Sequence, residues 1–220
     1  QLRELSERLD VAQFAEAERL LPEVRALDVA LRLPLLDVAV QGLRQLSPGQ
    51  FEAFKTAVDA LVWGDHRVDL FEFAMLRLLR RHLDPHFGGA ERTRVLHTNW
   101  ETLLPEALLV LSALAHAGAA GDTACAGAAF RAGASQLETG ERREWPLAGP
   151  QECCDLGQID AALDQLRQAG SWLKKNFLYA AATTAMHDRE LSVEEGELLR
   201  AIADSLDCPV PPFARAAGIA

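Results

Sequence analysis

Apolar side chains recur along the chain at three- and four-residue intervals, and strict alternation of apolar and polar positions is scarce. The first pattern places apolar residues on one face of an α-helix, whereas alternation is typical of a strand. Leu and Ala dominate and β-branched residues are few, which also favours helix. The sequence therefore predicts an all-α bundle of about ten helices, over residues 2–20, 22–31, 34–46, 48–64, 69–83, 101–117, 122–137, 157–169, 171–187 and 192–207.

Proline and glycine mark the breaks between these helices. Four prolines stand where a first helical turn can begin, namely Pro22, Pro34, Pro48 and Pro105. The stretch 84–99 reads as a loop, and the polar stretch 138–156 reads as a linker or a long surface loop. The second stretch would separate a helical region 1–137 from another, 157–220. We expect both regions to form one compact unit, because a small helical unit alone has too little apolar surface.

The strongest signal is an internal repeat. When the chain is shifted by 123 residues, segment 43–84 falls on 166–207 with eleven identities in 42 positions. The shared residues include the pairs Phe54/Phe177, Ala57/Ala180, Leu76/Leu199 and Leu83/Leu206. Each copy reads as helix, tight turn, helix. We therefore predict a duplicated helical hairpin whose copies bury their apolar faces against each other.

The turn of each copy carries acidic residues: Asp65, Asp69 and Glu72 in the first, and Asp188, Glu190 and Glu195 in the second. Helix capping explains most of them. Asp69 with Glu72, and Ser192 with Glu195, have the spacing of a capping box, in which each side chain bonds a free backbone N–H. A weak cation site formed by the six carboxylates is the alternative, since hard cations bind several oxygens. The spacing does not fit a calcium loop of 12 residues.

Composition limits the partners. The net charge is −10 over 220 residues, and an acidic surface repels phosphate, so nucleic acid is not expected as a partner. Four cysteines without a CxxC pair are too few for a disulfide scaffold, which indicates a reducing compartment. No apolar run is long enough for a membrane span. Residue 1 is Gln and the chain opens inside a predicted helix, so we expect further sequence upstream.

No catalytic motif is found in the sequence. His82 and His86 have the spacing of two zinc ligands on a helix, but Pro85 breaks that helix and the glutamate of a zinc-protease motif is missing. Nucleophile elbows, phosphate loops and dinucleotide motifs are absent as well. In the Ala-rich stretch 122–137, glycines at 127 and 133 predict close helix packing, and Cys125 reads as a small buried apolar residue. We therefore expect no catalytic residues and no cofactor in this segment.

The turns DHRVDLFE at 65–72 and DRELSVEE at 188–195 resemble the TerB-like family, over about 34–84 and 157–210. This resemblance implies an all-helical fold with a duplicated helical unit. TerB-like domains are linked to tellurite resistance, and related domains occur in membrane-bound co-chaperones. Acidic residues of this turn are proposed there to bind metal. The resemblance therefore suggests a stand-alone binding module for a metal or stress response.

Residues 26–51, 68–87 and 197–212 also resemble the C-terminal region of bacterial HtpX-like zinc metallopeptidases, relatives of the CAAX prenyl proteases. In that family the zinc-binding helix and the membrane spans lie upstream. The resemblance implies a non-catalytic accessory domain at the cytoplasmic face of the membrane, which serves regulation or protein interaction. Its partners would be a protein substrate or the peptidase domain itself, and zinc would belong to the parent protein. The TerB-like module remains the alternative.

Overall fold

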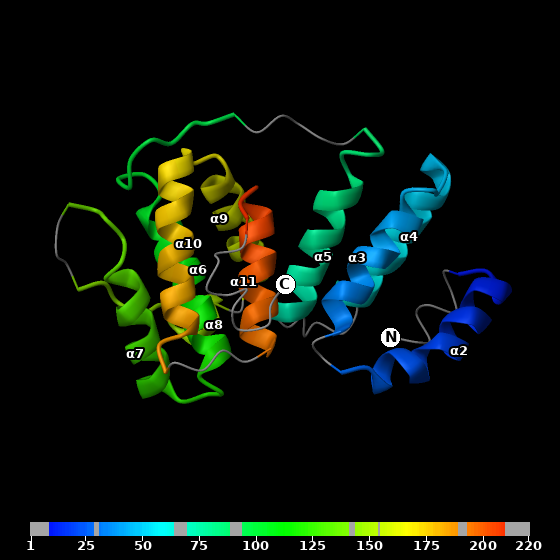
Figure 1. Cartoon of the computed structure of the whole chain (residues 1–220), viewed down its shortest axis with the longest axis horizontal. Helices are drawn as coiled ribbons and strands as arrows, with labels where there is room; N and C mark the ends of the chain where they lie inside the picture. Colours follow the sequence, from blue (N-terminus) through cyan, green and yellow to red (C-terminus); the bar gives the residue numbers. More distant parts are fainter. Residues whose placement is uncertain are drawn as a thin grey trace. The chain divides into compact units, whose positions relative to one another are not determined.

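The computed structural model describes residues 9–28, 31–63, 70–88, 94–140, 144–153, 155–188 and 193–209. Within these ranges the chain forms ten helices and no strand, apart from one isolated parallel bridge between His97 and Ala169. The all-α prediction is confirmed. Backbone contacts divide the chain into two compact units, Gln1–Glu91 and Arg92–Ala220, and Figure 1 shows the helices of each. The predicted linker 138–156 lies inside the second unit.

The first unit contains α2 (Val11–Ala26), α3 (Arg32–Leu43), α4 (Pro48–Trp63) and α5 (Leu70–Leu83). Ser47 caps α4 as its position before Pro48 predicts, because its hydroxyl accepts from the Gln50 N–H and the Gln50 side chain accepts from the Ser47 N–H. The prediction for Pro22 was wrong. It lies inside α2 instead of starting a helix, although proline there removes one backbone hydrogen bond.

The core of the first unit gathers where α3, α4 and α5 meet. Val40, Phe51 and Leu83 are buried, and further apolar side chains pack around them in a half-buried layer. The rings of Phe51 and Phe87 stack with centroids 4.0 Å apart, which closes the core beyond the end of α5. Such a pair contributes about 0.5–1.5 kcal/mol beyond its buried area. By contrast, α2 has no buried residue.

The second unit contains α6 (Leu104–Gly118), α7 (Thr123–Ala134), α8 (Pro150–Cys153), α9 (Leu156–Arg167), α10 (Ser171–Ala185) and α11 (Val193–Ser205). The short helix α8 was not predicted. Helix α6 packs against all five of the others. Its sequence explains this place, because Leu and Ala occupy most positions on every side, as expected of a helix buried all round. None of the described helices is both long and apolar enough to cross a bilayer.

Helices α7 and α10 approach each other closely at Gly133. A methyl group added at this glycine would overlap Thr184 Oγ1 and would lie 2.7 Å from the backbone oxygen of Ala180. Gly127, on the same helix, has no such neighbour, since its added carbon would meet only Arg131 Nη1 at 3.8 Å. The prediction of close packing is therefore confirmed at Gly133 and wrong at Gly127.

Two polar groups fix the loops of the second unit. The buried amide of Asn176 accepts hydrogen bonds from Trp100 Nε1 at 3.1 Å and the Glu138 N–H at 3.0 Å, and it donates to the Gln136 carbonyl at 2.8 Å. On α6, the Ser112 hydroxyl accepts from the backbone N–H of Ala148, whose carbonyl lies 2.9 Å from His116 Nε2. The segment 144–149 is thereby attached to α6.

Candidate functional site

The acidic turns were the one site candidate of the sequence, and the structure describes half of their residues. Asp65, Asp69 and Glu190 lie outside the described residues. Of the others, Glu72 is half-buried, Asp188 is exposed and Glu195 is half-buried. The Glu195 carboxylate lies against Gly118 of α6, so that an added methyl group there would overlap Glu195 Oε1. Within the described ranges, no three His, Cys, Asp or Glu side chains are placed to hold a metal ion.

The two predicted hairpins have the same helix limits. Helix α4 begins at Pro48 and α10 begins at Ser171, its counterpart 123 residues later. Helix α5 begins at Leu70 and α11 at Val193, again 123 residues apart. The ends of both helix pairs agree within one residue. Two segments that share sequence therefore also share the position and length of their helices.

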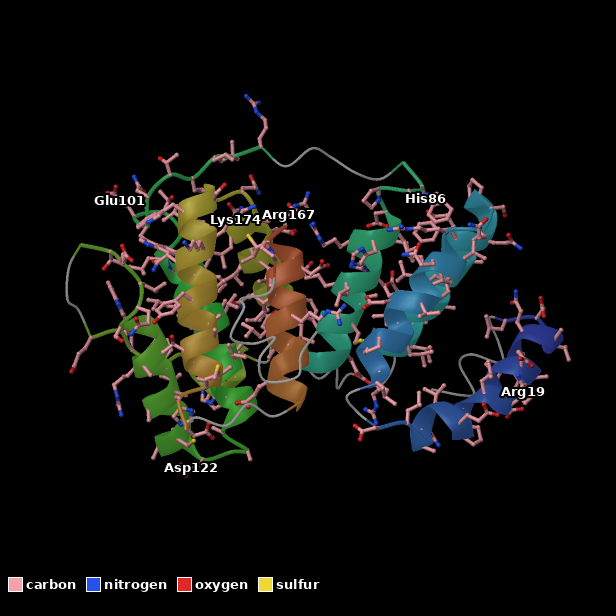
Figure 2. The ribbon with its side chains drawn as sticks, viewed as in Figure 1. Arg19, His86, Glu101, Asp122, Arg167 and Lys174 are labelled. Atoms are coloured by element: carbon pink, nitrogen blue, oxygen red, sulfur yellow. The ribbon has the colours of Figure 1, made fainter. Side chains whose placement is uncertain are left out.

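A cysteine and a histidine from distant parts of the second unit lie side by side. Cys125 is in the first turn of α7, and His187 follows the end of α10, with 3.4 Å between the cysteine Sγ and the histidine Nε2. Asp122 caps α7 and accepts hydrogen bonds from the N–H groups of Ala124 and Cys125, and Figure 2 shows it at the start of that helix. The expectation of a buried Cys125 was wrong, because the residue is half-exposed.

This pair alone does not make a catalytic or metal site. A cysteine nucleophile needs a base that a third group orients. Among the described residues, His187 has no second hydrogen-bond partner that would act in this way. A structural zinc site needs four ligands, and the pair supplies two. The contact joins residues 62 positions apart, so no local sequence pattern predicts it.

Two other histidines, His86 and His97, make contacts that stabilise the fold. Helix α5 ends at Leu83, so His86, labelled in Figure 2, lies beyond the helix. Its ring and that of Phe87 form a T-shaped pair. The predicted break at Pro85 is confirmed, and His82 and His86 do not share one helix. His97 lies between Thr102 Oγ1 at 2.9 Å and Gln165 Oε1 at 3.2 Å. These contacts hold the segment before α6 against the end of α9.

A small apolar groove lies between α4 and α5 in the first unit. Its lining is mostly aliphatic and aromatic and includes Phe51, Phe54, Val58, Leu76, Leu79 and Leu83. Charged side chains stand at its edges. Arg80 Nη2 donates to Asp59 Oδ1 at 2.7 Å across the two helices, and Lys55 and Asp84 complete the edge. The apolar floor and charged rim have, on a small scale, the arrangement that protein interfaces show.

No protein-family model matches the chain, and neither a curated protein nor a solved structure matches it. The resemblances to TerB-like domains and to HtpX-like peptidases therefore remain predictions from the sequence. What the chain does has to be argued from its own helices, from the repeated hairpin and from the groove between α4 and α5.

Proposed function

We propose that this chain is a non-catalytic accessory region of a membrane-bound zinc-dependent endopeptidase, in which it serves regulation or protein interaction. The three stretches that resemble such peptidases support the proposal through their places in the fold. Residues 26–51 span α3 and the start of α4, residues 68–87 contain α5, and residues 197–212 begin within α11. All three belong to the repeated hairpins or to the helix that leads into the first one.

The observation that carries the proposal is the apolar groove between α4 and α5 of the first hairpin. A surface of this kind suits the binding of a protein segment better than the binding of a small polar substrate, because few polar groups converge in it. The regulatory role follows from this chemistry, since a domain that binds proteins can recruit substrate to a peptidase or restrain it.

The proposal is tested first on the coding sequence upstream of Gln1. A zinc-binding HExxH helix, a distal glutamate ligand and apolar spans are expected there. Deleting residues 1–220 from that protein should slow the cleavage of a folded protein substrate and leave the cleavage of a short unstructured peptide unchanged. Equal loss on both substrates would contradict an accessory role, and an upstream sequence without the zinc motif would contradict the peptidase parent.

A further inference from the structure

The three described cysteines differ in what their sulfur atoms face. Cys153 is buried, whereas Cys125 and Cys208 are both half-exposed. The Sγ atoms of Cys153 and Cys208 lie against backbone carbonyl oxygens, that of Ala148 at 4.0 Å and that of Leu206 at 3.5 Å. A carbonyl oxygen only accepts hydrogen bonds, so it favours the neutral S–H form of the thiol. The neutral form is the less reactive one, because the thiolate is the nucleophile.

The sulfur of Cys125 faces a different kind of group. His187 Nε2 lies 3.4 Å from its Sγ, and an imidazole nitrogen can accept the thiol proton or, once protonated, donate to a thiolate. Cys125 also lies in the first turn of α7, where the N–H groups favour negative charge. Cys208 follows the last residue of α11, at the end where the carbonyl groups favour positive charge. The two half-exposed thiols thus stand at helix ends of opposite polarity.

One neighbouring charge opposes a thiolate at Cys125. Asp122 caps α7 through its Oδ1, which accepts from the N–H of Cys125 at 3.2 Å, so a carboxylate stands beside the same helical turn. Asp188, the residue after His187, is exposed, and water and salt screen its charge. The charge at position 122 therefore gives a way to change the reactivity of Cys125 without altering the histidine.

We propose that Cys125 is a modification site for hydrogen peroxide, with His187 as the group that accepts and returns the proton. The thiol proton passes to Nε2, and the thiolate sulfur attacks one peroxide oxygen. The S–O bond forms as the O–O bond breaks, and the leaving hydroxide takes the proton back and departs as water. The sulfur is oxidised to a sulfenic acid by the two electrons that reduce the peroxide. Peroxide suits the pair better than a disulfide reagent, because hydroxide needs a proton to leave and a thiolate does not.

A modification of this kind requires less of the site than catalysis does. It occurs once per molecule, so no third group has to orient His187 for repeated turnover. A half-exposed sulfur is open to a reagent as small as peroxide. The inference goes beyond the proposed function and does not require the peptidase parent, since it rests on the start of α7 and the end of α10. In Figure 1 these two ends lie at the same end of the second unit.

The experiment compares Cys125 with Cys208 in the same molecule. The full chain is treated with hydrogen peroxide, the sulfenic acid is trapped with a 1,3-dione, and mass spectrometry of tryptic peptides gives the rate at each cysteine. Trypsin separates the two, since Arg131 ends the peptide with Cys125 and Arg200 precedes the peptide with Cys208. Cys125 should react about three- to tenfold faster, as one charge-assisted hydrogen bond allows. Equal rates, or a faster reaction at Cys208, would overturn the proposal.

Three substitutions test the neighbours through the ratio of the two rates. His187→Gln should bring the ratio close to that of an unassisted thiol, because glutamine neither accepts the thiol proton nor returns it to hydroxide. His97→Gln is the matched control in the same unit, since His97 contacts a threonine and a glutamine, and it should leave the ratio unchanged. Asp122→Asn should raise the ratio about twofold or more, because asparagine still caps α7 but carries no charge. An unchanged ratio in His187→Gln would contradict the role of the imidazole.

Two further measurements separate reactivity from folding. Circular dichroism checks that each variant remains folded, and the wild type unfolded in urea should show a ratio of about one, because both thiols then face water. A ratio that survived unfolding would overturn the proposal, since the fold would not be its cause. If His187→Gln unfolds the chain, Asp122→Asn decides, and a ratio that fails to rise would overturn the proposal. The deletion experiment on the peptidase is independent of all these outcomes.

Discussion

Replacing Gly133 by alanine tests the closest contact between helices in the second unit. An alanine Cβ would lie 2.7 Å from the Ala180 carbonyl oxygen and would overlap the Thr184 hydroxyl. The hydroxyl can rotate, but the carbonyl belongs to the backbone of α10 and cannot yield without moving the helix. We therefore expect α7 and α10 to separate, with loss of packing around them.

The magnitude follows from two opposing effects. Forcing an extra methyl group into a packed core costs about 1–3 kcal/mol, and a contact with backbone belongs in the upper part of this range. Alanine gains about 0.8–1.0 kcal/mol over glycine in a helix interior, and less at Gly133, which lies near the end of α7. The net loss in free energy of unfolding should be about 1–2 kcal/mol. Gly127→Ala, with open space around it, should gain about 0.5–1 kcal/mol.

Comparing these two glycines removes the effects they share, because both substitutions restrict the unfolded chain equally. Urea unfolding followed by circular dichroism measures the stability. Hydrogen exchange of α10 amides then reports on the second unit alone, which avoids treating two units as one transition. The free energies of the two variants should differ by about 2–3 kcal/mol. If Gly133→Ala stabilised the chain as much as Gly127→Ala, the close approach of α7 and α10 would be refuted.

Four other predictions follow from single contacts. Asn176→Leu should destabilise the second unit by several kcal/mol, about 1–3 for each buried group that it leaves unpaired, and urea unfolding measures this. Asp122→Ala should cost about 1 kcal/mol and Asp122→Asn much less, because only the first removes the cap of α7; thermal unfolding separates them. The Arg19 side chain hydrogen-bonded to Glu16 lowers the pKa of that carboxyl. The small stabilisation by the Arg19–Glu16 pair is therefore present above the ordinary carboxyl pKa, and it is lost as the pH falls through the lowered pKa of Glu16. Arg19→Gln should raise the pKa of Glu16 in a carboxyl NMR titration. Adding Ca²⁺ should change the melting temperature of the wild type and of Asp188→Asn equally, since capping needs no cation; a change in the wild type alone would indicate a cation site.

The helices were predictable from the sequence where local chemistry and burial agree. Ser47 and Pro48 give the start of α4 because a hydroxyl cap and a proline with no N–H both suit a first turn. At Pro22 the same rule failed. Proline favours the first turn of a helix, but α2 continues through Pro22. The backbone carbonyl that the proline leaves without a hydrogen bond belongs to a helix with no buried residue, so water can bond it.

The candidate sites depended on contacts that no local pattern carries. The pairing of Cys125 with His187 arises because α7 crosses α10 at Gly133, and the crossing brings the start of α7 to the end of α10. Gly133 could be noticed in the sequence as a small residue in an Ala-rich helix, but its partner could not. The hydrogen bonds of Asn176 join residues about 40 and 76 positions away, so its amide looks like any other polar residue on a helix.

The two copies of the internal repeat are equivalent in sequence but differ in burial. Aligning the two copies predicts which positions are equivalent, but sequence identity alone does not show which copy is covered. The structure supplies that second fact, because Phe177, Ala181 and Ile202 of the second hairpin are buried, whereas their counterparts Phe54, Val58 and Leu79 in the first stay half-buried. The charged residues follow this difference in burial. Lys55, Asp59 and Arg80 are half-buried in the first copy, whereas the second copy has the buried residues Leu178, Ala182 and Ala203 at the same positions. A position that stays partly exposed can keep a charged side chain in water, but a buried position would have to desolvate it, so the second copy carries apolar residues there.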